Sequence, residues 1–184
     1  MKAREVARYI ISAIKNQMTD ISPEEFDVTP LKLQKLLYYC QGYSLALTGK
    51  PIFEDEIEAW KLGPVVKEIY QEYRKYSGGI IPFRSVRSDS NPNETIRAII
   101  NLVLQDKGQY DGKTLARATH KERPYIESFQ GAYTNAKIPV ELLKEYFTEE
   151  LIKREEDYEC EDEFWKSQGE PLSKTDLEAV LEDL

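Results

Sequence analysis

Few residues of this chain could carry chemistry, and the scarcity of histidine limits the choice first. His120 is the only histidine among 184 residues, and Cys40 and Cys160 are the only cysteines. A general base, a Cys/His dyad or a histidine-containing zinc site would need His120. Zinc takes three or four ligands from cysteine, histidine and carboxylate, and no segment has that spacing. We therefore predict no catalytic residue, no metal site and no cofactor.

One nucleophilic arrangement, a Cys40–His120 dyad, stays open as an alternative. Cys40 falls on the apolar stripe of a helix that we predict to be buried, where a thiol is usually inert. We expect His120 to lie at a helix junction instead, with its ring nitrogens bonded to backbone groups. A Cys/His hydrolase would lose activity when either residue is replaced by alanine, whereas a binding protein would lose mainly stability.

Two further motifs have an ordinary structural explanation. Gly63-Pro64 is typical of a helix N-terminus, which attracts anions, but no glycine-rich phosphate loop accompanies it. Acidic pairs such as Glu54/Glu56 and Glu155/Glu156 are expected to be solvated charges. Neither motif predicts a reaction.

Aromatic residues are the more informative group. Tyrosine joins a large apolar ring to a polar tip and is common at interface hot spots, although it also packs cores. Both interpretations stay open, and we would test Tyr39 first because it lies off the main apolar stripe of its helix. The candidate partner-binding residues are Lys35, Tyr38, Tyr39, Tyr43, Trp60, Tyr70, Tyr73 and His120.

The element that must position most of these residues is a helix from Pro30 to Thr48. Thr29-Pro30 provides a capping hydroxyl and a proline at the first helical position, and Gly49 ends the helix. Leucines and tyrosines cover most of its circumference, so the helix is expected at the centre of the fold. Gly42 within it predicts the close approach of another backbone. A narrow polar strip is expected to face solvent and contains Lys32, Gln34, Lys35 and Gln41.

Periodicity and capping signals predict roughly seven helices before residue 155. Starts are expected at Gly63-Pro64, Asn91-Pro92, Asp111, Pro124 and Pro139, and an amphipathic helix precedes residue 20. Alternation around Ile57 to Trp60 predicts a short strand or β-hairpin. The fold class is therefore mainly α, a compact multi-helix domain with one short hairpin.

Charge divides the chain into two parts, a domain at 1–150 and an acidic extension at 151–184. From Glu149 onward there are 14 acidic and 4 basic residues, so the rest of the chain, with 19 acidic and 21 basic residues, carries about +2. Ser173 and Asp176 predict a short terminal helix in the extension. The extension could solubilise the protein, fold on a basic partner surface or mimic nucleic acid.

Bulk properties also restrict location and partners. No basic stripe indicates nucleic-acid binding, and no apolar run approaches the roughly 18 residues of a membrane span. The two distant cysteines suit a reducing compartment. We expect a soluble cytoplasmic protein that binds neither DNA nor membrane, and leave homo-oligomer formation open.

A family resemblance covers residues 5–148 in ordered blocks. These blocks are Leu31 to Gly42, Gly49 to Phe53, Ile57 to Trp60, Gly63 to Val66, Ile69-Tyr70, Leu115, Thr119-His120, Pro124-Tyr125 and Ile138-Pro139 through Tyr146-Phe147. The sequence resembles the Panacea, or SocA-like, antitoxin domain family. Tyr125 departs from the pattern, since the family more often places tryptophan after this proline.

The resemblance implies a compact helical domain that acts as the antitoxin of bacterial and phage toxin–antitoxin pairs, prophages included. Its partner would be a cognate protein toxin, encoded by an adjacent gene and neutralised by direct binding. Many relatives carry an added DNA-binding domain; this chain begins directly at the domain, so we do not expect DNA-binding autoregulation. The alternatives are a proteolysis adaptor, the Cys/His hydrolase and a phage or plasmid transcription factor.

Overall fold

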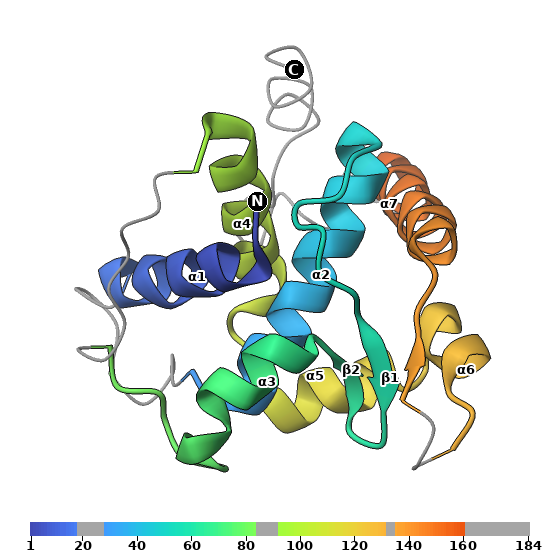
Figure 1. Ribbon diagram of the computed structural model, residues 1–184. Coiled ribbons are helices and arrows are strands. Elements are labelled where there is room, and N and C mark those ends of the chain that lie inside the picture. The colour runs from blue at the N-terminus through green and yellow to red at the C-terminus, as the bar shows by residue number, and fades with distance from the viewer. Residues whose placement is uncertain (18–27, 84–91, 132–134, 161–184) are drawn as a thin grey trace.

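One central helix organises the fold in the computed structural model, which describes residues 1–17, 28–83, 92–131 and 135–160. Helix α2 (Pro30–Thr48) runs through the middle of the molecule and contacts most of the other elements (Figure 1). Within these described ranges the protein has seven α-helices and one three-stranded sheet. The predicted fold class, mainly α with a short hairpin, is confirmed.

The ends of α2 follow the local sequence signals. The Thr29 hydroxyl accepts a hydrogen bond from the Lys32 backbone N–H at 3.2 Å, and Pro30 occupies the first turn. Gly49 ends the helix with φ of 69°, a conformation that glycine adopts without steric cost. Both predicted boundaries are therefore confirmed.

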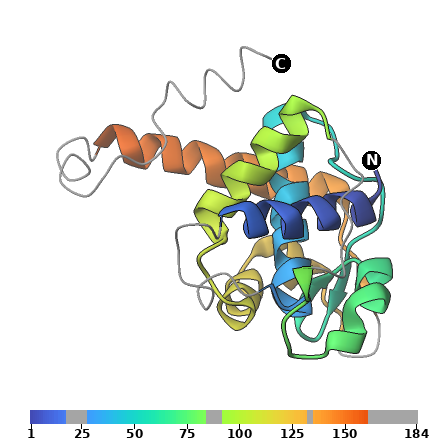
Figure 2. The ribbon, with the colours of Figure 1, turned by 90° about the vertical axis from the view of Figure 1, so that its left-hand side faces the viewer.

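Six other helices surround α2. Figure 2 shows α1 and α4 crossing one side of α2, with α7 on the other. Asn93 and Asp111 cap α4 and α5 through their side chains, so the cap of α4 is Asn93 and not the predicted Asn91. The bounds are α1 (Ala3–Gln17), α3 (Lys67–Tyr73), α4 (Glu94–Lys107), α5 (Gly112–Thr119), α6 (Arg123–Ser128) and α7 (Val140–Cys160), with a 3-10 turn η1 (Arg74–Tyr76) after α3. No helix of the described part has the length and apolar content to cross a membrane.

The sheet consists of β1 (Glu58–Trp60), β2 (Gly63–Val65) and β3 (Ala136–Lys137), in the order β2-β1-β3 with antiparallel pairing. The strand predicted near Trp60 is confirmed, whereas the helix start predicted at Gly63-Pro64 is wrong. Gly63 begins β2 with φ of 94°, and a Cβ there would lie 2.7 Å from Lys35 Nζ. The glycine therefore serves a tight hairpin, and α3 begins only at Lys67.

The predicted solvent-facing strip of α2 is also wrong, because its four polar side chains are buried. Relative exposures are 2% for Lys32, 4% for Gln34, 0% for Lys35 and 2% for Gln41. Periodicity assigned these residues to solvent because they are polar, but neighbouring chain segments cover every side of this helix. Burial of such groups is tolerated when each one finds a hydrogen-bond partner.

The two glutamines illustrate how these groups are satisfied. The Gln34 amide accepts from Val66 N at 2.7 Å and donates to Val66 O at 3.3 Å. The Gln41 amide accepts from Ile52 N at 3.1 Å and donates to Phe53 O at 3.1 Å. Each amide thus binds the backbone of a separate segment and fixes it against α2.

Helix α7 packs closest to α2 at Gly42. A Cβ at this position would overlap the ring of Phe147, so the glycine admits an aromatic side chain and not the backbone that we expected. The Phe147 ring lies 5.4 Å from Tyr38, 5.8 Å from Tyr43 and 5.2 Å from Tyr146, in edge-on contacts that aromatic pairs prefer. These contacts place α7 against the tyrosine face of α2.

The proposed division of the chain at residue 150 stays a prediction. Helix α7 continues across that position to Cys160, and Leu151 and Arg154 contact the body. The predicted terminal helix at Ser173 and Asp176 lies outside the described residues.

Gly42→Ala should destabilise the protein. Alanine favours a helix by about 1 kcal/mol, but the overlap with Phe147 should outweigh this gain and give a net loss of about 1–3 kcal/mol. Urea unfolding measures the loss. Gly78→Ala is the control, because a Cβ at Gly78 meets nothing within 4 Å. Equal stability of the two variants would contradict the packing described here.

Candidate partner-binding site

The eight predicted partner-binding residues fall into two groups in the structure. Five have little exposed surface: Lys35, Tyr38, Tyr39, Tyr43 and Tyr73. The other three, Trp60, Tyr70 and His120, remain partly exposed near the β1–β2 hairpin. The tyrosines on α2 therefore pack against the interior, and their contact with a partner stays a prediction.

The hairpin presents an apolar surface, which we call the hairpin face and define by Trp60, Leu62 and Tyr70. The rings of Trp60 and Tyr70 meet edge-on at 4.9 Å. Leu62 is 61% exposed and Tyr70 is 38% exposed. Leu62 was not among the predicted residues. Its exposure could have been predicted from its place before Gly63, because side chains in a two-residue hairpin loop lie in solvent.

Two side chains hold the tip of this hairpin. His120 contacts the Lys61 carbonyl through Nε2 at 3.0 Å and the Ala116 carbonyl through Nδ1. The Tyr125 hydroxyl donates to the Trp60 carbonyl at 2.9 Å. The expected role of His120, with both ring nitrogens bonded to backbone groups at a helix junction, is confirmed.

The same contacts bear on the Cys40–His120 alternative. Both nitrogens of His120 are engaged by carbonyl oxygens, so neither is positioned to activate a thiol. Cys40 is fully buried, and burial raises the pKa of its thiol far above the ordinary value. A thiol in this environment is a poor nucleophile.

Lys35 supports the hairpin from beneath. Its Nζ donates to the Pro64 carbonyl at 2.8 Å, and its side chain is fully buried. Burial lowers the pKa of Lys35 to about 7, and the negative charge of Glu122 opposes this change. Lys35 therefore anchors β2 to α2 and lies out of reach of a partner.

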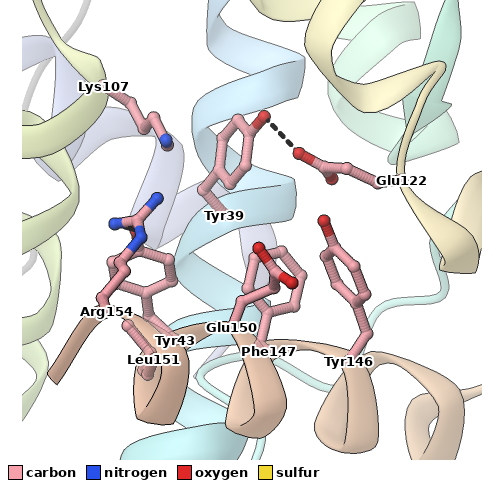
Figure 3. Close-up of a pocket in the computed structure, with 9 residues that line it drawn as sticks. All are labelled: Tyr39, Tyr43, Lys107, Glu122, Tyr146, Phe147, Glu150, Leu151 and Arg154. Atoms are coloured by element: carbon pink, nitrogen blue, oxygen red, sulfur yellow. Dashed lines mark hydrogen bonds between the residues drawn. The ribbon is translucent and has the colours of Figure 1, made fainter. Parts of the chain in front are cut away.

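A recess between α2 and α7 is the second notable feature, and Figure 3 shows it. The Tyr39 hydroxyl donates to Glu122 Oε1 at 2.8 Å, and Lys107 Nζ lies 5.2 Å from the centre of the Tyr39 ring. The recess has a volume of about 50 Å³. Its lining residues are Tyr39, Tyr43, Lys107, Glu122, Tyr146, Phe147, Glu150, Leu151 and Arg154.

One side of this recess is a charged cluster centred on Asp106. The Arg154 guanidinium donates to Asp106 Oδ2 at 2.8 Å and to the Tyr43 hydroxyl at 3.0 Å. Tyr43 donates to Asp106, and Lys107 Nζ lies 3.2 Å from the same carboxylate oxygen. Burial alone would raise the pKa of Asp106, but the hydrogen bonds from Arg154 and Tyr43 outweigh it and lower the pKa. The cluster ties α2, α4 and α7 together.

Glu122 forms the other side and was missed by the sequence analysis. Burial raises the pKa of its carboxyl group, while the hydroxyls of Tyr38 and Tyr39 and the charge of Lys107 oppose the rise. Its Oε2 atom is buried and has no hydrogen-bond partner among the residues that the structure describes. Glu122 directly precedes Arg123, where α6 begins. No sequence pattern at this helix start predicts that the acidic side chain is buried.

No group of three or more potential metal-binding side chains occurs in the described part of the chain. The volume of the recess is also well below the roughly 300 Å³ typical of the smallest cofactor and drug-sized sites.

A model of the family described as "Antitoxin SocA-like, Panacea domain" matches residues 33–126, about half of the chain. The chain belongs to this family. The match confirms the resemblance and includes α2 from Leu33 onward, the hairpin, His120 and Glu122, whereas α7 follows it.

A curated relative of this Panacea-family chain is "Antitoxin SocA" of Caulobacter vibrioides (strain NA1000 / CB15N), which is 29% identical over 119 residues. The alignment covers 59% of this chain and 63% of the relative, so the chain spans less than two thirds of the relative's length. No solved structure matches the chain.

The buried Lys35 should give the Panacea domain a measurable pH dependence. The unfolded chain keeps the Lys35 proton up to about pH 10.5, whereas the folded chain loses it near pH 7. The unfolded state therefore binds more protons in this interval, and stability should rise by about 2 kcal/mol over the first two pH units above neutrality. Urea unfolding should show this slope in the wild type and lose it in Lys35→Met. Exposed Lys113→Met is the control and should keep the slope.

Glu122 should act in the opposite direction. Its pKa is raised above the ordinary value of 4.5, so the folded state binds more protons than the unfolded state above that pH. Stability should consequently fall as the pH rises from mildly acidic to neutral, and Glu122→Gln should remove this loss. The measurement is chemical unfolding across that range, with exposed Glu141→Gln as the control. If the free energy of unfolding changed with pH equally in wild type and Glu122→Gln, the raised pKa of Glu122 would be refuted.

Proposed function

We propose that this chain is the antitoxin of a toxin–antitoxin pair and neutralises a cognate protein toxin by binding it directly. The observation that carries the proposal is membership of the SocA-like Panacea family over residues 33–126. The relative named Antitoxin SocA supports the same role. We further propose that an adjacent gene encodes the toxin, since the two members of such a pair must be made together.

The hairpin face is the surface that we propose for docking. Trp60, Leu62 and Tyr70 provide the aromatic and aliphatic groups that dominate interface energies. His120 and Tyr125 hold the backbone beneath them before any partner arrives. Such pre-organisation reduces the entropy lost on binding. A stable complex would bury about 800 Å² on each partner, an area that extends beyond these three residues.

Co-expression tests the proposed function. The product of the adjacent open reading frame should arrest growth alone, and this chain should restore growth and co-purify with it. Unchanged abundance of that product in the presence of this chain separates direct neutralisation from a proteolysis adaptor, which would shorten its half-life. A harmless product that fails to co-purify would refute the antitoxin proposal.

Leu62→Glu should weaken the complex by at least about 2 kcal/mol, since it places a charge within the proposed interface. Isothermal titration calorimetry with the purified toxin measures the change. Ile80→Glu is the matched control, because Ile80 is a similarly exposed aliphatic residue that belongs neither to the hairpin nor to the recess lining. Equal affinities of the two variants would exclude the hairpin face as the docking surface.

A further inference from the structure

A buried carboxylate oxygen without a partner marks the recess between α2 and α7. Glu122 Oε1 accepts from Tyr39 at 2.8 Å, whereas Glu122 Oε2 is buried without a partner of hydrogen-bond geometry among the described residues. The buried Tyr38 hydroxyl also lacks such a partner and interacts with the same carboxylate. We propose that this recess receives an arginine side chain of the bound toxin, with Glu122 as its principal hydrogen-bond acceptor. This inference rests on the proposed function and names a chemical group that the toxin must supply.

The acceptors in the recess suit a guanidinium group. Figure 3 shows the Tyr146 hydroxyl directed toward the Glu122 carboxylate, with Glu150 beside them. Glu150 pairs with Lys153 at 3.1 Å, but both side chains are exposed, by 38% and 63%. Exposed ion pairs contribute little to stability, so Glu150 can exchange Lys153 for an incoming cation. A guanidinium has five N–H donors and can bind several such oxygens at once.

The charges around the recess favour a cation, although two cations also line it. Lys107 and Arg154 are both bound to Asp106, at 3.2 Å and 2.8 Å, and are partly neutralised there. With Glu122 and Glu150 ionised and Lys153 displaced from Glu150, the side chains of Asp106, Lys107, Glu122, Glu150 and Arg154 carry a net charge of −1. One bound guanidinium would make the site neutral and would compensate the buried Glu122 charge.

Size and shape favour arginine over larger groups. A volume of about 50 Å³ holds a few water molecules or one planar guanidinium. The rings of Tyr39 and Tyr146 line the same space, and guanidinium groups stack on aromatic rings more readily than the strongly hydrated lysine ammonium does. Glu122 Oε2 is buried, so side chains that line the recess must move to admit the arginine.

The first experiment uses small probes on the full chain. N-acetylarginine amide, titrated at neutral pH and followed by NMR of the tyrosine rings, should shift the Tyr39 and Tyr146 resonances. N-acetylcitrulline amide has the same shape without the charge and should bind at least about tenfold more weakly. Equal binding of the two probes, or no shift at these rings, would overturn the proposal.

Matched variants locate the effect. Glu122→Gln keeps the size of the side chain and its hydrogen bond with Tyr39 but removes the charge, and should abolish the preference for arginine. Tyr146→Phe keeps the ring and should weaken arginine binding by about threefold. Exposed Glu141→Gln should bind both probes as the wild type does. An undiminished preference for arginine in a folded Glu122→Gln variant would overturn the proposal.

A second experiment separates this inference from the proposed function. Glu122→Gln should weaken the complex with the purified toxin at least about tenfold. Replacing one arginine of the toxin should weaken it equally, and combining the two substitutions should cause no further loss of affinity. If the toxin binds wild type and Glu122→Gln equally, the recess is not the arginine site, while the antitoxin function stands. If no toxin binds but the arginine probe still binds wild type more tightly than Glu122→Gln, the proposed antitoxin function is refuted. The recess would then remain an arginine site.

Discussion

Buried polar side chains on α2 determine how the surrounding segments are placed. Lys32, Gln34, Lys35 and Gln41 are almost fully inaccessible, and each forms a hydrogen bond with the backbone of a neighbouring segment. Gln34 and Lys35 both bind residues 64–66, whereas Lys32 and Gln41 bind two other segments. Lys32 Nζ, for example, donates to the Gly108 carbonyl at 2.6 Å, where α4 ends. A group left without its partner in this interior would cost about 1–3 kcal/mol, and more if charged. The apolar contacts of α2 favour compaction of any kind, whereas these bonds are satisfied in only one arrangement.

The same constraint connects the two surface features. Lys35 holds β2 from beneath, and the short segment from His120 to Tyr125 holds the hairpin tip from the side. Glu122 lies within that segment and accepts from Tyr39 at the recess. Lys35 and Glu122 also affect each other's electrostatics in the interior. A disturbance at the recess therefore has a short physical path to the hairpin face, through one turn between α5 and α6.

The sequence predicted the features that depend on neighbouring residues. The start of α2 at Thr29-Pro30, its end at Gly49 and the cap at Asp111 each involve groups a few residues apart, and each was correct. The burial of Lys35 could not be predicted in this way, because its partner Pro64 lies 29 residues along the chain. The strand at β3 has two residues and depends on pairing with β1. Glu122 lies 83 residues from Tyr39, and nothing near it distinguishes it from the many solvated acids.

The position of α7 gives the two surface features different origins. The hairpin face and Glu122 lie inside residues 33–126, the region matched by the family model, whereas Tyr146, Glu150 and Arg154 belong to α7 and follow that region. Phe147 joins the two parts by occupying the space above Gly42, so the side chains of α7 are held at fixed positions over the tyrosine face of α2. Under the two proposals above, the hairpin face would provide contact energy from the shared domain. The recess, which is lined partly by α7, would bind only toxins that supply an arginine. A toxin without this arginine would leave the buried Glu122 carboxylate unpaired and would bind more weakly.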